Sequence, residues 1–277
     1  MDLIVSTEWL ADHLSDPDLV VIDASWHMPA TKRNGAAEFA EGHIPGAGFF
    51  DLDAVSDHSS SLPHMLPSAD DFAAAMSALG LSNTSRAVIY DAAGLFSAPR
   101  LWWMLRVFGF ENAGILDGGL PAWKIEGRAL EAGPAKARTG SFTAKLNPAL
   151  VADLTKVRDA LNARSHLVLD ARSADRFFGR APEPRPGLAC GHMPGAKNLP
   201  STDLVAQGRL KEPAALKQAL EALGVTGQTP VITSCGSGVS AAIITLAMVR
   251  VGLPMGALYD GSWTEWGGNP ALPVATD

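Results

Sequence analysis

The sequence predicts an α/β protein of two tandem domains, each a mostly parallel sheet with helices on both faces. The chain of 277 residues can be laid over itself with an offset of about 145 residues, so that similar segments recur in both halves. Within each half, short β-rich runs alternate with helical patterns, as is typical of α/β folds. The runs 87–90 and 230–233 lack the alternation of a half-exposed strand, as expected when helices cover both faces of a parallel sheet.

The internal repeat has two copies, which indicates a tandem duplication rather than a solenoid. The copies share a strand ending in Asp-Ala, a Gly-His-x-Pro-Gly-Ala turn, a second strand, and an Asp-Gly turn followed by a tryptophan. The matched segments are 20–24 with 168–171, 41–47 with 190–196, 87–92 with 230–235, 116–119 with 259–262, and Trp123 with Trp266. We therefore expect one domain at 1–138 and another at 139–277, with a polar, turn-prone linker at about 131–147.

Helical patterns at 70–79 and 214–223 are each followed directly by a glycine, the residue that most often ends a helix. Ligands of parallel sheets bind beyond the carboxyl ends of the strands. We therefore expect the functional site at residues that directly follow the strand-like runs.

Composition and charge narrow the possible functions. With 47% hydrophobic residues the chain can build real cores, and a net charge of −7 argues against binding to a nucleic-acid backbone. The N-terminus lacks the pattern of an export signal, and no run of about 18 apolar residues predicts a membrane span. The two cysteines make a disulfide framework improbable. We expect a soluble, cytoplasmic protein without membrane or nucleic-acid partners.

Cys235 is the strongest candidate for a catalytic residue. It follows the run 230–233 and precedes a glycine-bearing loop that leads into a helical pattern at 241–251. In such an arrangement the loop N–H groups and the helix N-terminus converge on the sulfur and favour its thiolate form. A free cysteine is more often a buried core residue. However, Gly236 and Gly238 favour a loop that turns its amides toward an anion.

The position that matches Cys235 in the first half of the chain is Ala92. Only the second half is therefore expected to carry a nucleophile.

These motifs resemble those of the tandem-domain rhodanese family, and the likeness covers nearly the whole chain. It rests on the Gly-His-x-Pro-Gly-Ala turn in both halves, on Ser-Ala-Pro-Arg-Leu-Trp-Trp at 97–103, and on Asp-Gly-Ser-Trp at 260–263. The Cys-Gly-Ser-Gly-Val-Ser loop at 235–240 resembles that of the 3-mercaptopyruvate sulfurtransferase branch. The resemblance implies an inactive first rhodanese domain and a second one whose cysteine accepts sulfur as a persulfide.

The resemblance further implies that Arg176 and Arg185 hold the carboxylate of the sulfur donor. A planar guanidinium binds a carboxylate through two hydrogen bonds, which suits an α-keto acid. Thiosulfate-preferring relatives usually carry basic residues in the active loop, whereas this loop is neutral. The loop residues expected to contact the substrate are Gly236, Gly238, Val239 and Ser240, the last of which replaces a more common threonine. We expect 3-mercaptopyruvate as the donor, with thiosulfate as the alternative.

By the same resemblance, Asp53, His64 and Ser237 form a relay. A hydroxyl beside the thiolate and a His–Asp pair can deprotonate the cysteine or return a proton to the pyruvate enolate. His43 and His192 lie in the repeated turn of both halves, which favours a turn-stabilising role instead.

Other classes of protein fit the sequence less well. A cysteine phosphatase needs an arginine at the end of a Cys-x5-Arg loop, but that position is Ala241. A cysteine hydrolase needs a dedicated base, for which His64 is the single candidate. A non-catalytic persulfide carrier stays open, although Arg176 and Arg185 argue against it.

We expect the reaction to need no metal or other cofactor. Cys190 is expected to be structural, because it has no second cysteine at the spacing of metal ligands. The sequence also contains no nucleotide-binding motif. The expected partners are a small-molecule sulfur donor and an acceptor, which is a thiol, cyanide or a thioredoxin-like protein.

Overall fold

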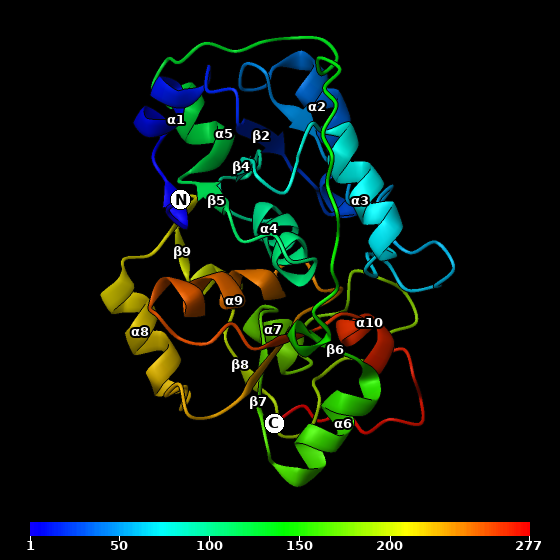
Figure 1. Ribbon diagram of the computed structural model, residues 1–277. Coiled ribbons are helices and arrows are strands. Elements are labelled where there is room, and N and C mark those ends of the chain that lie inside the picture. The colour runs from blue at the N-terminus through cyan, green and yellow to red at the C-terminus, as the bar shows by residue number, and fades with distance from the viewer. The chain divides into compact units, whose positions relative to one another are not determined.

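The computed structural model describes the whole chain from Met1 to Asp277, which forms two compact units (Figure 1). Unit 1 consists of residues 1–57, 66–147 and 207–210, and unit 2 of residues 58–65, 148–206 and 211–277. Each unit is built on a five-stranded parallel sheet flanked by helices, which is the fold class that the sequence predicts. The domain boundary at 138–139 and the linker stay predictions.

The sheet of unit 1 has the strand order β1-β5-β4-β2-β3. Its strands are β1 (Ile4–Val5), β2 (Leu19–Asp23), β3 (Gly48–Phe49), β4 (Arg86–Tyr90) and β5 (Ala113–Leu116), and β10 (Arg209–Leu210) also belongs to this unit. Its helices are α1 (Thr7–His13), α2 (Gly35–Glu41), α3 (Ala69–Ala78), α4 (Ala98–Val107) and α5 (Gly119–Ile125), with a 3₁₀ turn at Pro29–Thr31.

Both faces of the unit 1 sheet are buried because side chains alternate across each strand. Val21 of β2 and Val88 of β4 belong to one apolar cluster, together with residues of α1, α2 and α5. Ile22 and Ile89 point to the opposite face, and α4 packs against β4 and β5. This two-sided burial explains why the strands read as unbroken apolar runs.

The sheet of unit 2 has the corresponding strand order β6-β12-β11-β7-β8. Its strands are β6 (Val151–Ala152), β7 (Leu167–Asp170), β8 (Lys197–Asn198), β11 (Val231–Ser234) and β12 (Ala257–Tyr259), and β9 (Val205–Ala206) also belongs to this unit. Its helices are α6 (Leu154–Ala163), α7 (Ala174–Phe177), α8 (Pro213–Ala222), α9 (Ala241–Arg250) and α10 (Ser262–Trp266), with 3₁₀ turns at Pro148–Leu150 and Ser201–Asp203.

The unit 2 sheet is also covered on both faces. Val157 of α6 and Trp263 of α10 pack with strand residues such as Ile232 in one apolar cluster. On the other face α8 and α9 lie side by side (Figure 1), and α9 is tied to β11 by the Thr233–Thr245 hydroxyl pair at 3.1 Å. The equal strand order of the two sheets matches the duplication read from the sequence.

The repeated Gly-His turn has the same structure in both units. His43 Nδ1 lies 2.8 Å from the carbonyl oxygen of Phe39, and the two rings stack at 3.8 Å. His192 Nδ1 lies 2.9 Å from the carbonyl oxygen of Phe177, with the same stacking distance of 3.8 Å. Both histidines are buried, so their contacts fit the turn-stabilising role expected for them.

The helix ends follow the sequence signals. Gly80 and Gly224 adopt φ values of +86° and +84° after α3 and α8, a conformation that favours glycine. None of the helices is long and apolar enough to cross a lipid bilayer.

Candidate active site

Cys235 is the first residue after β11, at the carboxyl end of the strand. β11 lies in the middle of the unit 2 sheet, between β7 and β12. The thiol is therefore placed where parallel sheets bind their ligands. The residue is buried, with 2% of its surface exposed, and the helix α9 begins at Ala241 after a five-residue loop.

The backbone of Cys235 and Gly236 is fastened to the start of α10. The Cys235 N–H donates to Ser262 Oγ at 3.2 Å, and the Cys235 carbonyl accepts from the Trp263 N–H at 2.9 Å. The Gly236 carbonyl accepts from both the N–H and the hydroxyl of Thr264, at 2.9 and 2.6 Å. Two successive carbonyls of the loop thus face α10.

The amides of the loop are left for an anion. The N–H groups of Gly236, Ser237, Val239 and Ser240 donate no hydrogen bond to another protein group. Gly238 adopts a φ of +78°, as expected for a glycine that turns such a loop. Gly236 does not adopt a positive φ. These N–H groups are therefore available to bind a negatively charged sulfur.

The absence of a side chain at Gly236 instead allows Arg176 to approach the loop closely. A Cβ at this position would lie 3.1 Å from Nη2 of Arg176, so the guanidinium lies directly against the loop. Arg176 extends from α7 and is held by Glu183, which accepts from its Nε at 3.2 Å and from its Nη2 at 2.5 Å.

Glu183 in turn belongs to a buried ionic network. Arg172 donates to Glu183 at 2.9 Å, to Asp170 at 2.7 Å, and to the carbonyl of Gly191 at 2.8 Å. Its guanidinium also lies 4.2 Å from the centre of the Trp263 ring, and the side chains of Arg172 and Asp170 are fully buried. The network leads from the end of β7 to Arg176. This network was not predicted from the sequence, although Asp170-Ala-Arg after a strand is a signal for it.

The structure brings together His64 and Ser237, two members of the relay that the resemblance implies. Nδ1 of His64 lies 2.9 Å from Oγ of Ser237, and both residues are buried in unit 2. His64 has a φ of +63°, a conformation uncommon for residues other than glycine. Asp53, the third member of the expected relay, lies in unit 1, where Oδ2 accepts from Trp26 Nε1 at 3.0 Å. Its participation stays a prediction.

The remaining expected substrate contacts also lie in unit 2. Val239 is buried, whereas Arg185 and Ser240 are half-buried. Cys190 is an exposed free thiol. No group of three or more His, Cys, Asp or Glu side chains in the chain could hold a metal ion.

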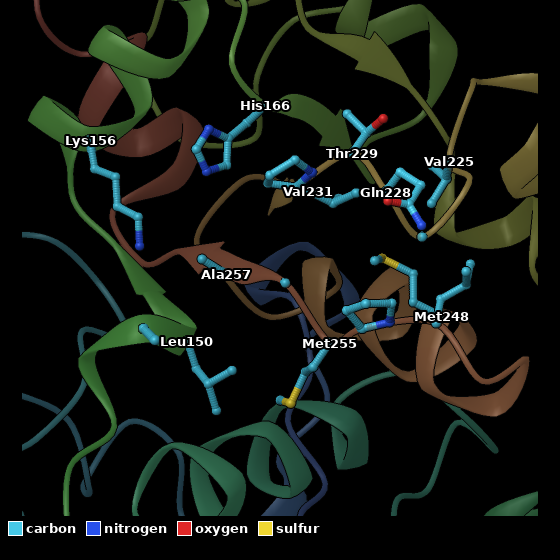
Figure 2. Close-up of a pocket in the computed structure, with 16 residues that line it drawn as sticks. Leu150, Lys156, His166, Val225, Gln228, Thr229, Val231, Met248, Met255 and Ala257 are labelled. Carbon is cyan, nitrogen blue, oxygen red and sulfur yellow. The ribbon is translucent and has the colours of Figure 1, made fainter.

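A pocket of about 430 Å³ in unit 2 lies at the opposite edge of the sheet from Cys235 (Figure 2). It is lined by residues at the amino ends of the strands, among them Leu150, His166, Val231 and Ala257. Figure 2 shows Lys156 and His166 on one side and Met248 on the other. Burial and then the charge of Lys156 lower the pKa of His166. Because β11 is four residues long, about 13 Å of strand separates this pocket from the thiol.

The chain is similar to proteins of known activity over almost its whole length. It is 47% identical over 271 residues to the 3-mercaptopyruvate sulfurtransferase of Escherichia coli strain K12, covering 98% of this chain and 96% of that one. It is 42% identical to the mitochondrial thiosulfate/3-mercaptopyruvate sulfurtransferase 1 of Arabidopsis thaliana, covering 98% and 77%. The crystal structure of the E. coli 3-mercaptopyruvate sulfurtransferase SseA superposes with a TM-score of 0.87 at 44% identity, covering 95% and 99%.

These relatives confirm the predicted fold class and the predicted sulfurtransferase class of enzyme. The family model of the rhodanese-like domain matches twice, at residues 6–126 and 153–269. With two matched domains, a shared fold and full-length relatives, the chain belongs to the rhodanese family.

Proposed function

We propose that this protein transfers sulfur from 3-mercaptopyruvate, through a persulfide on Cys235, to a thiol acceptor. The proposal is carried by the neutral loop after β11, where the N–H groups of Gly236, Ser237, Val239 and Ser240 donate to no other protein group and Arg176 lies against Gly236. The loop has donors for a negatively charged sulfur but no cation of its own. A cation at its edge suits a substrate whose carboxylate is separated from its sulfur.

In the first step, the Cys235 thiolate attacks the sulfur of 3-mercaptopyruvate. The new S–S bond forms as the C–S bond breaks, and the electron pair of that bond leaves with the carbon as the enolate of pyruvate. Arg176 and Arg185 hold the carboxylate in place with charge-assisted hydrogen bonds. The loop amides stabilise the negative charge on the persulfide.

The enolate then needs a proton at its carbon. His64 and Ser237, 2.9 Å apart, form a path by which a proton reaches it, and Asp53 is the proposed third member of the relay. In the second step, an acceptor thiolate attacks the outer sulfur of the persulfide. It takes that sulfur and leaves Cys235 as a thiolate. We propose a low-molecular-weight thiol, cyanide or a thioredoxin-like protein as acceptor, in a reducing compartment such as the cytoplasm.

The test compares 3-mercaptopyruvate and thiosulfate as donors, side by side, with a small thiol and with cyanide as acceptors. We expect kcat/KM to be higher for 3-mercaptopyruvate, and intact-mass spectrometry after the donor step to show one added sulfur atom. The Cys235→Ser protein serves as the blank and should show neither turnover nor added sulfur. A higher kcat/KM for thiosulfate would overturn the proposed donor, and an active Cys235→Ser protein would overturn the mechanism.

Arg185 provides a separate test of the donor assignment. Reversing its charge in Arg185→Glu should abolish activity with 3-mercaptopyruvate while activity with thiosulfate is retained. Equal loss with both donors would instead point to a folding defect, which circular dichroism and thermal melting would reveal.

A further inference from the structure

The side chain of Ser262 is hydrogen-bonded to the backbone of Cys235. Its hydroxyl accepts a hydrogen bond from the Cys235 N–H at 3.2 Å and donates one to the carbonyl of Tyr259 at 2.8 Å. The side chain is fully buried. It therefore bridges the backbone of the proposed nucleophile to the end of the neighbouring strand β12.

The backbone of Ser262 is strained. Its φ is +50°, in the left-handed region that residues other than glycine rarely adopt. The matching residue of unit 1 is Gly119, whose φ is +54°. The same turn is thus built with glycine in the unit without a nucleophile and with a strained serine in the unit that carries Cys235.

The amide bound by Ser262 is paired in both units, but by different residues. In unit 1 the N–H of Ala92, the position that matches Cys235, donates to Ser25 Oγ at 2.8 Å. The position that matches Ser25 in unit 2 is Arg172, whose guanidinium is committed to Asp170 and Glu183. In unit 2 the hydroxyl comes instead from α10, from a position where glycine would avoid strain.

We propose that Ser262 is a positioning residue for Cys235 in the sulfur-transfer reaction. The proposal rests on the proposed function. By fixing the Cys235 N–H against the end of β12, the Ser262 hydroxyl sets the direction in which the thiol points into the loop. Trp263 and Thr264 bind the carbonyls of Cys235 and Gly236. Neither binds the Cys235 N–H, which donates to Ser262.

Two substitutions separate the effect of the Ser262 hydroxyl from the effect of the backbone strain. Ser262→Gly removes both, whereas Ser262→Ala removes the hydroxyl and keeps a Cβ at positive φ. We expect the glycine variant to melt at a higher temperature than the alanine variant. Both should lower kcat with 3-mercaptopyruvate by about tenfold or more while KM changes less than about twofold, because the loss concerns alignment of the nucleophile rather than donor binding.

The loss of the contact can be observed directly on the resting protein. Labelling with [¹⁵N]cysteine gives two backbone amide signals, since the chain has two cysteines. In both Ser262 variants the Cys235 signal should shift and its hydrogen exchange should become faster, while Cys190 serves as the internal reference. The rate of Cys235 alkylation by iodoacetamide at neutral pH should fall in parallel.

Ser234→Ala is the matched control, because Ser234 immediately precedes Cys235 and its buried hydroxyl has no hydrogen-bond partner. Its kcat, exchange rate and alkylation rate should equal those of the wild type. An unchanged kcat in Ser262→Gly would overturn the proposal. So would a kcat that is low in Ser262→Ala but returns to the wild-type value in the more stable Ser262→Gly. The amide and alkylation measurements need no sulfur donor, so they still judge the role of Ser262 if the wild type proves inactive with 3-mercaptopyruvate.

Discussion

Asp23 and Asp170 end equivalent strands of the two sheets, but only Asp170 is paired with an arginine. Asp170 binds Arg172 at 2.7 Å, whereas Asp23 accepts a hydrogen bond from the N–H of Ser25 at 2.9 Å. Burial raises the pKa of Asp23 to about 6. The position that carries an ion pair in unit 2 thus carries a carboxyl that is readily protonated in unit 1.

The raised pKa of Asp23 predicts a specific pH dependence of stability. Between about pH 4 and pH 6 the folded protein holds a proton on Asp23 that the unfolded chain has lost, so stability falls as the pH rises through this window. The ionisation of Asp23 is expected to cost the folded protein about 3 kcal/mol at pH values above 6. Asp23→Asn should therefore gain stability relative to the wild type as the pH rises from 4 to 7.

Calorimetric melting of both proteins across this range measures the effect. Asp12→Asn, a change at an exposed residue of α1, is the control and should follow the wild-type curve. Parallel curves for Asp23→Asn and the wild type would contradict the prediction.

Glu183 is expected to control donor affinity through Arg176. In Glu183→Gln the neutral amide no longer binds two cations, so the Arg176 guanidinium loses its fixed orientation. We expect KM for 3-mercaptopyruvate to rise about tenfold, the effect of losing one charge-assisted hydrogen bond. Steady-state kinetics measures it, with Glu221→Gln on the exposed surface of α8 as the control. An unchanged KM with a folded protein would show that Arg176 does not bind the donor.

His64 and Ser237 should act as a unit. Each single substitution, His64→Gln or Ser237→Ala, should lower kcat by about 100-fold, the usual contribution of proton transfer by a positioned side chain. Because both belong to one path, the double substitution should cost little more than either single one. Pyruvate release in a single turnover tests this, and additive losses would show that the 2.9 Å contact is not used in proton transfer.

Substitutions of the two glycines of the loop should have different effects, one on stability and the other on KM. Gly238→Ala places a Cβ at a φ of +78° and should lower stability by about 1 kcal/mol. Gly236→Ala introduces no such strain, but its Cβ meets Nη2 of Arg176 at 3.1 Å, so it should raise KM for 3-mercaptopyruvate while stability is kept. Urea denaturation and steady-state kinetics on both variants separate the effects. Equal stability losses would contradict this assignment.

Much of the fold could be predicted because its signals are local. Buried parallel strands read as apolar runs, and glycines close the helices, so β4, β11, α3 and α8 lie within one residue of the segments read from the sequence. Cys235 could be placed at a strand end for the same reason. Its partner Ser262 could be aligned with Gly119, but a positive φ at a serine has no sequence signature.

The ionic network around Arg176 could not be predicted, because it depends on contacts between loops. Glu183 lies seven residues from Arg176 and eleven from Arg172, with no periodic element to fix the spacing. The φ of His64 and its contact with Ser237, 173 residues away along the chain, likewise arise from tertiary structure.

Residues 58–65 belong to unit 2 although they occur in the first half of the sequence. A gene cut after codon 138 would therefore separate Cys235 and Ser237 from His64. The second copy of the duplication cannot be inherited alone as a complete set of proposed catalytic residues. The first copy has Ala92 where the second has Cys235, but it still supplies His64 to the proposed active site, so recombination that exchanges single copies would separate these residues.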